Sequence, residues 1–305
     1  MGNMIELFSN YTFQIVALGS ALLGLISGVI GCFSVLRKQS LLGDGVSHSA
    51  LPGVVMAFII LGSKKTEVLL LGALVSGLLS TLLIVVIVRY TRVKFDSALA
   101  LVMSAFFGLG LALLTYVQKI PNSNQAGLNR FIFGQASTLL QRDIAFMMVC
   151  GVTMLAIILL LWKEFKLFTF DMEFAQIIGF PSKGLNLLLS FLTVLVIILG
   201  LQTVGAILMS AMLISPAVAA RQWTNKLWVM VILSAVFGAV SGVAGTFASS
   251  MIPKLPTGPA IVVCANLIVS ISLLFAPSRG LLFRVYQRKR IINKIEGDGR
   301  DVPTS

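Results

Sequence analysis

The sequence predicts an all-α protein, a polytopic bundle of eight or nine transmembrane helices. Of its 305 residues, 57% are hydrophobic and only 11% are charged, whereas soluble domains carry roughly 25% charged residues. Uninterrupted apolar runs such as 11–36, 66–88 and 144–162 match the ~20 residues that a helix needs to cross the hydrocarbon core. These observations exclude a soluble enzyme and a secreted protein. They also exclude a nucleic-acid-binding domain, because the net charge of +12 comes from basic residues in the short segments between the runs.

Nine candidate spans follow from the apolar runs and their polar interruptions. They cover residues 11–36, 41–62, 66–88, 97–118, 144–162, 185–201, 204–220, 227–251 and 259–277. The segment before the first span lacks the basic region and cleavage site of a secretory signal, so we expect this span to be retained. The second span differs from the others because it contains Asp44 and the only histidine, His48.

The sixth and seventh spans leave the count open. Only Gln202 and Thr203 separate 185–201 from 204–220. The two runs form either a tight hairpin, which makes nine spans, or one helix broken at Gly200 to Gly205, which makes eight. We expect a transmembrane domain over residues 1–280 and a basic, partly disordered cytoplasmic tail over 281–305.

Small residues recur at every fourth position in two of the spans. Gly24 and Gly28 lie in the first span, and Gly238 and Gly242 lie in the eighth. This spacing lets helix backbones approach closely and indicates a tightly packed bundle. From the sequence, the glycines could equally form a contact between two copies or only relieve crowding and permit bending.

The distribution of lysine and arginine predicts the orientation, because basic loops stay on the cytoplasmic side. With the N-terminus outside and nine alternating spans, the inner segments hold seventeen basic residues and the outer segments hold six. The chain is therefore expected to be a multi-pass protein of the cytoplasmic (inner) membrane, with its C-terminus in the cytoplasm.

Asp44 and His48 are the ionisable residues that stand within a span. Ten of the eleven acidic residues lie at span ends, in loops or in tails, and His48 is the only histidine. Four residues apart on a helix, the two side chains share one face, and a carboxylate with an imidazole suits manganese, iron or zinc. Pro52 is expected to kink the helix beside them. Alternatively, the two residues satisfy each other structurally, or Asp44 caps the helix.

A family resemblance is most specific in this same segment. The stretch from Leu36 to Gly53, Leu-Arg-Lys-Gln-Ser-Leu-Leu-Gly-Asp-Gly-Val-Ser-His-Ser-Ala-Leu-Pro-Gly, resembles the signature of membrane permeases of bacterial ABC importers for manganese, zinc and iron. Phe133 to Ala136, Ser215 to Ala217 and Leu255 to Ile261 agree with the same family in order along the chain. The resemblance covers about residues 10 to 280.

The resemblance implies a type II-like ABC importer permease that moves a divalent metal ion as its substrate and holds no permanent cofactor. Asp44 and His48 match the residues that the family associates with the metal path. Ser47, Ser215 and Asn266 could add oxygen ligands, although such groups more often form hydrogen bonds between helices. The expected partners are ABC ATPase subunits, an extracytoplasmic metal-binding protein, and a second permease, either identical or similar.

The chain is not expected to be an enzyme, because it lacks a Gly-x-x-x-x-Gly-Lys-Ser/Thr phosphate loop. ATP hydrolysis would then take place in a separate subunit. The longest inner loop contains a short amphipathic helix stopped by glycine and proline. Its residues Asp171, Glu173, Ala175 and Gly179 resemble the segment through which ABC permeases grip their ATPases. The alternative is a connecting helix that lies on the membrane surface.

Two further functions remain open from the sequence. A stand-alone, ion-coupled secondary carrier would be expected to place several ionisable groups in its spans, and this chain has one Asp and one His there. A permease for a metal chelate would keep the ABC architecture but would not need a pair of ligands for a bare ion. Among bare ions, one carboxylate with one imidazole favours manganese over zinc.

Overall fold

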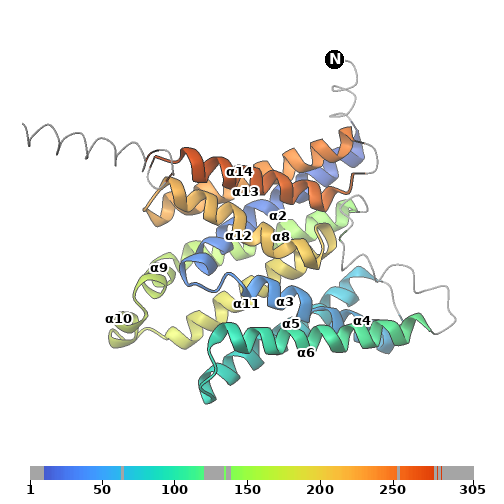
Figure 1. Ribbon diagram of the computed structural model, residues 1–305, viewed down its shortest axis with the longest axis horizontal. Coiled ribbons are helices and arrows are strands. Elements are labelled where there is room, and N and C mark those ends of the chain that lie inside the picture. The colour runs from blue at the N-terminus through green and yellow to red at the C-terminus, as the bar shows by residue number, and fades with distance from the viewer. Residues whose placement is uncertain are drawn as a thin grey trace, which may run out of the picture.

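The computed structural model describes residues 10–62, 65–119, 134, 139–252, 255–277, 280 and 283, and it is helical in these parts (Figure 1). The helices are α2 (Tyr11–Leu36), α3 (Leu42–Ser49), α4 (Leu51–Leu61), α5 (Thr66–Tyr90), α6 (Phe95–Gln118), α8 (Gln141–Leu160), α9 (Trp162–Phe170), α10 (Met172–Ile177), α11 (Ser182–Thr203), α12 (Ala206–Trp223), α13 (Leu227–Met251) and α14 (Thr257–Phe275). The predicted tail, 281–305, lies outside the described residues except for Phe283.

The prediction of a polytopic helical bundle is confirmed. Eight described segments are long and apolar enough to cross a membrane, with α3 and α4 counted together as Leu42–Leu61. The helix α12 falls outside this group although it has 18 residues, because Arg221 and Gln222 lie within it. The boundaries also move: the fifth predicted span, 144–162, is the helix α8, and the chain bends at Leu161 into the separate helix α9.

The sixth and seventh predicted spans form a hairpin. The chain leaves α11 through Val204 and Gly205, and Gly205 has φ of 90°, a conformation that glycine adopts without strain. A Cβ placed on Gly200 would collide with the side chain of Met209. Residues nine apart would be separated by ~13 Å along one straight helix, so α12 must fold back against α11. The two segments therefore form a hairpin, although α12 is not among the eight described segments that are long and apolar enough to cross a membrane.

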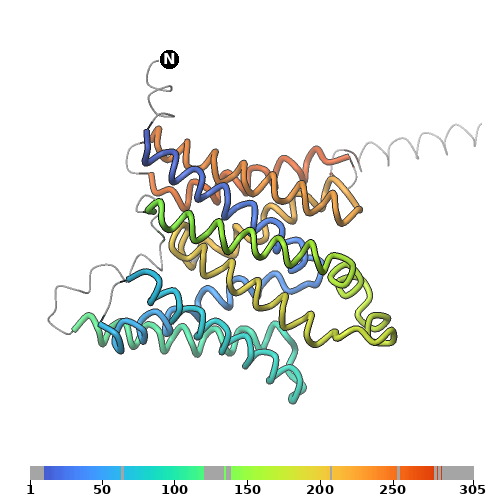
Figure 2. Tube along the Cα trace, turned by 180° about the vertical axis from the view of Figure 1, so that it is seen from behind, coloured from blue at the N-terminus to red at the C-terminus, as the bar shows by residue number. Residues whose placement is uncertain are grey.

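The helices form a bundle with two distinct edges. The helices α13 and α14 lie with α2 at one edge, α4, α5 and α6 lie at the other, and α11 and α12 lie between them (Figures 1 and 2). The short helix α10 projects at one end of the bundle, and the first residues of α2 lie at the opposite end. In the most apolar 18-residue stretch of each helix, 78% of the residues are buried in α2 and 67% in α11, against 28% in α6 and in α8. The first and the sixth spans thus provide the core.

The two glycine motifs meet each other within one chain. A Cβ on Gly24 would collide with the carbonyl of Gly238, and one on Gly28 with the carbonyl of Ser234. The Ser234 hydroxyl donates a 2.8 Å hydrogen bond to the Gly28 carbonyl. The motifs therefore join α2 to α13, which gives them a role in packing the monomer.

We expect Gly238→Ala to destabilise the protein, since the added Cβ must push α2 away from α13. Overpacking of this kind costs typically ~1–3 kcal/mol. Gly108→Ala is the matched control, because a Cβ there meets nothing within 4 Å and alanine favours a helix over glycine. Thermal unfolding in detergent should show a lower midpoint for Gly238→Ala alone; equal midpoints for the two variants would refute the close contact.

Candidate functional site

The second span is broken in the middle of the bundle. The helix α3 ends at Ser49, Ala50 follows, and α4 begins at Leu51 with Pro52 in its first turn. Proline has no amide hydrogen to offer the carbonyl of His48, four residues earlier. The predicted interruption near Pro52 is therefore present, and it makes the eight residues of α3 a separate short helix that carries both Asp44 and His48.

Asp44 and His48 face each other on α3. The distance between His48 Nε2 and Asp44 Oδ1 is 3.5 Å, and the side chains keep 21% and 37% of their exposure, respectively. Asp44 does not cap the helix, since the residue before α3 is Leu41 and forms no side-chain cap. Both side chains are thus accessible, and both can turn a nitrogen or oxygen atom toward a small ion.

The surroundings of α3 hold it tightly in place. It lies between α12 on one side and α5 and α6 on the other (Figure 1). A Cβ on Gly43 would come within 3.0 Å of Leu213 of α12, and one on Gly45 within 3.1 Å of Leu99 of α6. The His48 ring stands edge-on to Phe107 of α6, with 4.9 Å between ring centroids. The pair is therefore presented from a rigid support.

One polar neighbour of the pair was missed from the sequence. Ser210 of α12 interacts with the Asp44 carboxylate. A serine in an apolar run gives no signal of its own, because its role depends on how α12 packs against α3. Close packing of the two helices accompanies this contact, since a Cβ on Gly43 of α3 would lie 3.6 Å from the Cα of Ser210.

The three proposed oxygen ligands are engaged elsewhere. The Ser47 hydroxyl donates a 2.7 Å hydrogen bond to the carbonyl of Gly43 within α3, and the side chain is almost fully buried. Ser215 donates a 2.9 Å hydrogen bond to Asn266 Oδ1, which joins α12 to α14. The structure brings Ser215 and Asn266 together but pairs neither of them with Asp44 or His48.

Within the described part of the chain, no third His, Cys, Asp or Glu side chain joins the pair to make a metal-binding group. A carboxylate and an imidazole can supply two ligands to a divalent ion. The remaining positions around an ion here would be filled by water, by neutral oxygen atoms or by another subunit. Such an open site suits an ion that must bind and then leave.

The predicted coupling segment is a compact elbow at one end of the bundle. Asp171 separates α9 from α10, and its carboxylate accepts a 2.9 Å hydrogen bond from the Phe174 amide. Gly179, at φ of 88°, ends the turn, and the Phe180 amide returns to the Ala175 carbonyl at 3.0 Å. Ala175 is 1% exposed, whereas Glu173 is exposed. The short helix expected in this loop is therefore present as α10, and it is preceded by α9, which the sequence did not predict and which ends at Phe170.

Arg37 connects this elbow to the segment that leads into α3. It directly follows α2, its guanidinium lies 4.3 Å from the ring centroid of Phe168 on α9, and it donates a 2.7 Å hydrogen bond to Asn186 of α11. Burial lowers the pKa of Arg37 to about 10, so it remains charged at neutral pH. Four residues after Arg37 the chain enters α3 through Leu41. Arg37 thus links α9 and α11 to the segment that leads into α3.

This chain is similar to known membrane transport proteins. Residues 9–276 match the family model of the ABC 3 transport family. The chain is 48% identical to the zinc transport system membrane protein TroC of Treponema pallidum, over 95% of this chain and 98% of that protein. It is 46% identical to the manganese transport system membrane protein MntC of Bacillus subtilis, over 91% of this chain and 64% of that protein.

A solved structure shares the fold. PsaBC from Streptococcus pneumoniae, determined in complex with a Fab, superimposes with a TM-score of 0.81 at 31% identity, over 94% of this chain and 99% of that one. The resemblance inferred from Leu36 to Gly53 is therefore confirmed, although of the stretch 133–136 only Gly134 is described. From the matched family model and these relatives, we conclude that the chain is a polytopic membrane protein belonging to the ABC 3 transport family.

Proposed function

We propose that the chain is the permease subunit of an ATP-driven importer, and that its substrate is a bare divalent transition-metal ion, manganese in preference to zinc or iron. The observation that carries this proposal is the accessible Asp44–His48 pair at 3.5 Å on a broken span. A relative named for zinc and one named for manganese support a metal substrate. One imidazole with one carboxylate favours manganese, since zinc sites usually gather more nitrogen or sulfur ligands.

The path is proposed to form between two permeases, identical or similar. One copy offers two ligands in its described part, whereas a second pair across a two-fold axis would offer four. The remaining exposure of the two side chains, 37% for Asp44 and 21% for His48, supports this arrangement, because it leaves part of each side chain open to a second copy. Ser210 is added to the proposed path as a neutral oxygen beside Asp44, ahead of Ser47, Ser215 and Asn266.

Energy is proposed to enter through separate ABC ATPase subunits that dock on the elbow of α9 and α10. The chain has no phosphate loop, and α10 projects beyond the bundle (Figure 2). Arg37 would pass the movement of the elbow toward α3. The permease itself would catalyse no reaction and hold no permanent cofactor, and an extracytoplasmic binding protein would deliver the ion at the opposite end.

The end that carries α10 is proposed to be cytoplasmic, together with the basic tail, in the inner membrane. Ten described basic residues lie in the segments at this end: Arg37, Lys38, Arg89, Arg92, Lys94, Lys163, Lys166, Lys183, Arg221 and Lys226. Three lie at the other end: Lys65, Lys119 and Arg142. Because basic segments are retained inside, this asymmetry supports an outer N-terminus and an inner C-terminus.

Uptake by the reconstituted permease and its ATPase subunits tests the proposal. We expect manganese to enter proteoliposomes only with ATP, to be unaffected by a protonophore, and to be competed by free zinc but not by a bulky manganese chelate. Uptake that required a proton or sodium gradient and no ATP would support a secondary carrier instead. Preference for the chelate over free manganese would favour a chelate permease.

A further inference from the structure

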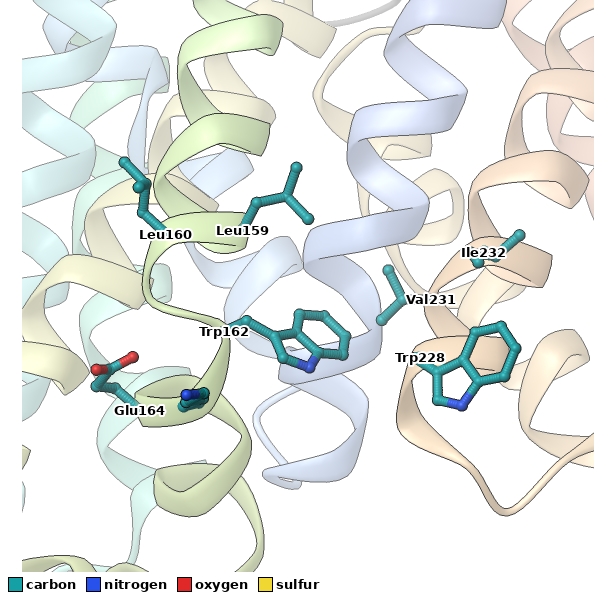
Figure 3. A pocket seen from close by; sticks show the side chains of 8 residues that line it. Leu159, Leu160, Trp162, Glu164, Trp228, Val231 and Ile232 are labelled. Atoms are coloured by element: carbon teal, nitrogen blue, oxygen red, sulfur yellow. The ribbon is translucent and has the colours of Figure 1, made fainter.

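A cavity opens on the bundle surface where α8 bends into α9 beside α13. Its volume is about 660 Å³. Its apolar lining consists of Leu159, Leu160, Trp162, Trp228, Val231 and Ile232, and Lys163 and Glu164 complete it. Figure 3 shows Trp162 and Trp228 on either side of the opening, with Leu159 and Ile232 above them toward the middle of the bundle.

A second cavity of about 420 Å³ continues the first toward the end of the bundle. The two cavities share Trp162 and Trp228. The second adds Lys166 and Phe170 from α9 and Asn225, Lys226 and Leu227 from the start of α13. Together they form one groove, here called the α9–α13 groove. Its lining changes from aliphatic, through two indoles, to lysine.

We propose that the α9–α13 groove binds one anionic phospholipid, such as phosphatidylglycerol. An acyl chain would lie along Leu159, Leu160 and Ile232, which are more than half exposed. The indoles would flank the glycerol and ester groups, because tryptophan is favoured at the level of the headgroups. The phosphate would lie near Lys166 and Lys226, both exposed.

The charges in the groove favour an anionic headgroup. Three lysines, Lys163, Lys166 and Lys226, line the two cavities against one carboxylate, that of Glu164. Figure 3 shows the Glu164 side chain directed away from the two indoles. The ion pairs found among the described residues join Asp44 with His48 and Glu67 with Arg142, so they leave these lysines free for a phosphate.

The position of the groove favours a lipid over a second permease. Seen from behind, α8 crosses the front of the bundle (Figure 2), whereas α3 with the proposed metal pair lies on the face seen in Figure 1. A second copy that completed the metal path would cover the face of α3 and leave the groove to the bilayer. This inference rests on the proposed cytoplasmic position of the α10 end, where anionic headgroups would meet the lysines.

A bound lipid would have a structural consequence for coupling. The groove lies where α8 passes into α9, and α9 leads through Asp171 into α10. A lipid between α9 and α13 would hold the elbow at a fixed distance from the bundle. Without it, the elbow would be braced on this side only by the protein's own side chains.

Lipid retained by the full-length permease tests the inference. The protein is purified in detergent and exchanged into a mixture of phosphatidylglycerol and phosphatidylcholine, and bound lipid is counted by native mass spectrometry. We expect one phosphatidylglycerol to persist per chain in preference to phosphatidylcholine. The double variant Lys166→Gln/Lys226→Gln should bind it on the order of tenfold more weakly, because lysines near a headgroup act together.

Two further variants test whether the loss of lipid is specific to the groove. Lys94→Gln/Lys183→Gln removes the same charge at the same end, from exposed residues outside the groove, and should retain the lipid. Ile232→Trp keeps the lysines but fills the aliphatic part and should expel it. Equal retention of both lipids, or equal loss from both double variants, would overturn the site. ATP-driven uptake by the wild type would stand in either case, so this failure is distinguishable from failure of the proposed function.

Discussion

Replacing Asp44 with asparagine is expected to lower metal uptake by at least about tenfold. Loss of a group that only supports a metal ligand typically costs roughly 10- to 100-fold in metal affinity or activity, and loss of a ligand should cost no less. Asparagine keeps the size and hydrogen-bonding capacity of the side chain but removes its charge. A divalent ion that has lost water in the bundle needs that charge, and Asp44, in the first turn of α3, is the acidic residue of the Leu42–Leu61 span. The measurement is initial manganese uptake in proteoliposomes at matched protein content.

His48→Gln is expected to reduce uptake as well, and to reduce zinc uptake more than manganese uptake. Zinc depends more strongly on nitrogen ligands, whereas manganese accepts oxygen. Asp96→Asn is the matched control, because it makes the same change at an acidic side chain that is exposed in the first turn of α6.

A purely structural pair would give a different pattern. The melting temperature would fall in both variants, since the 3.5 Å contact would be altered. Uptake per folded molecule would stay at the wild-type rate. That pair of results would remove Asp44 and His48 from the path.

The second large effect is expected at the elbow. Glu173→Lys reverses an exposed charge on α10, and Ala175→Trp inserts a large ring where the side chain is 1% exposed. Both variants should abolish ATP-driven uptake while the permease still binds manganese. Glu173→Lys should leave the melting temperature unchanged, because its effect lies in docking, whereas Ala175→Trp should also disturb the fold of the elbow.

The readout for the elbow is the ATPase activity that co-purifies with the permease, measured beside uptake. Ser250→Lys is the control, because Ser250 is exposed at the opposite end, in the last turn of α13. Unchanged uptake in both elbow variants would mean that α10 only lies on the membrane surface and that the ATPase docks elsewhere.

The sequence was informative wherever a local physical rule decides the structure. The apolar runs gave most of the helices, Pro52 gave the break in the second span, and Gly179 gave the end of α10. The spacing of Asp44 and His48 was enough to put them on one face, and the 3.5 Å contact agrees.

Features that depend on packing between distant segments could not be predicted from the sequence. The sequence showed two glycine motifs but could not show that Gly24 meets Gly238 within the same chain. It offered Ser215 and Asn266 as ligands, yet they bond to each other, and the contact of Ser210 with Asp44 follows only from the position of α12. The bend at Leu161 could not be predicted, because no proline or glycine lies beside it.

The presence of a single histidine allows a direct test of the metal site. Because His48 is the only imidazole in the chain, any imidazole nitrogen coupled to manganese in the untagged, isolated permease must belong to it. Pulsed electron paramagnetic resonance of the Mn(II)-loaded protein should show a nitrogen coupling that disappears in His48→Gln and weakens in Asp44→Asn. Bound manganese without any nitrogen coupling, or with a coupling unchanged in His48→Gln, would contradict the assignment of the metal path to Asp44 and His48.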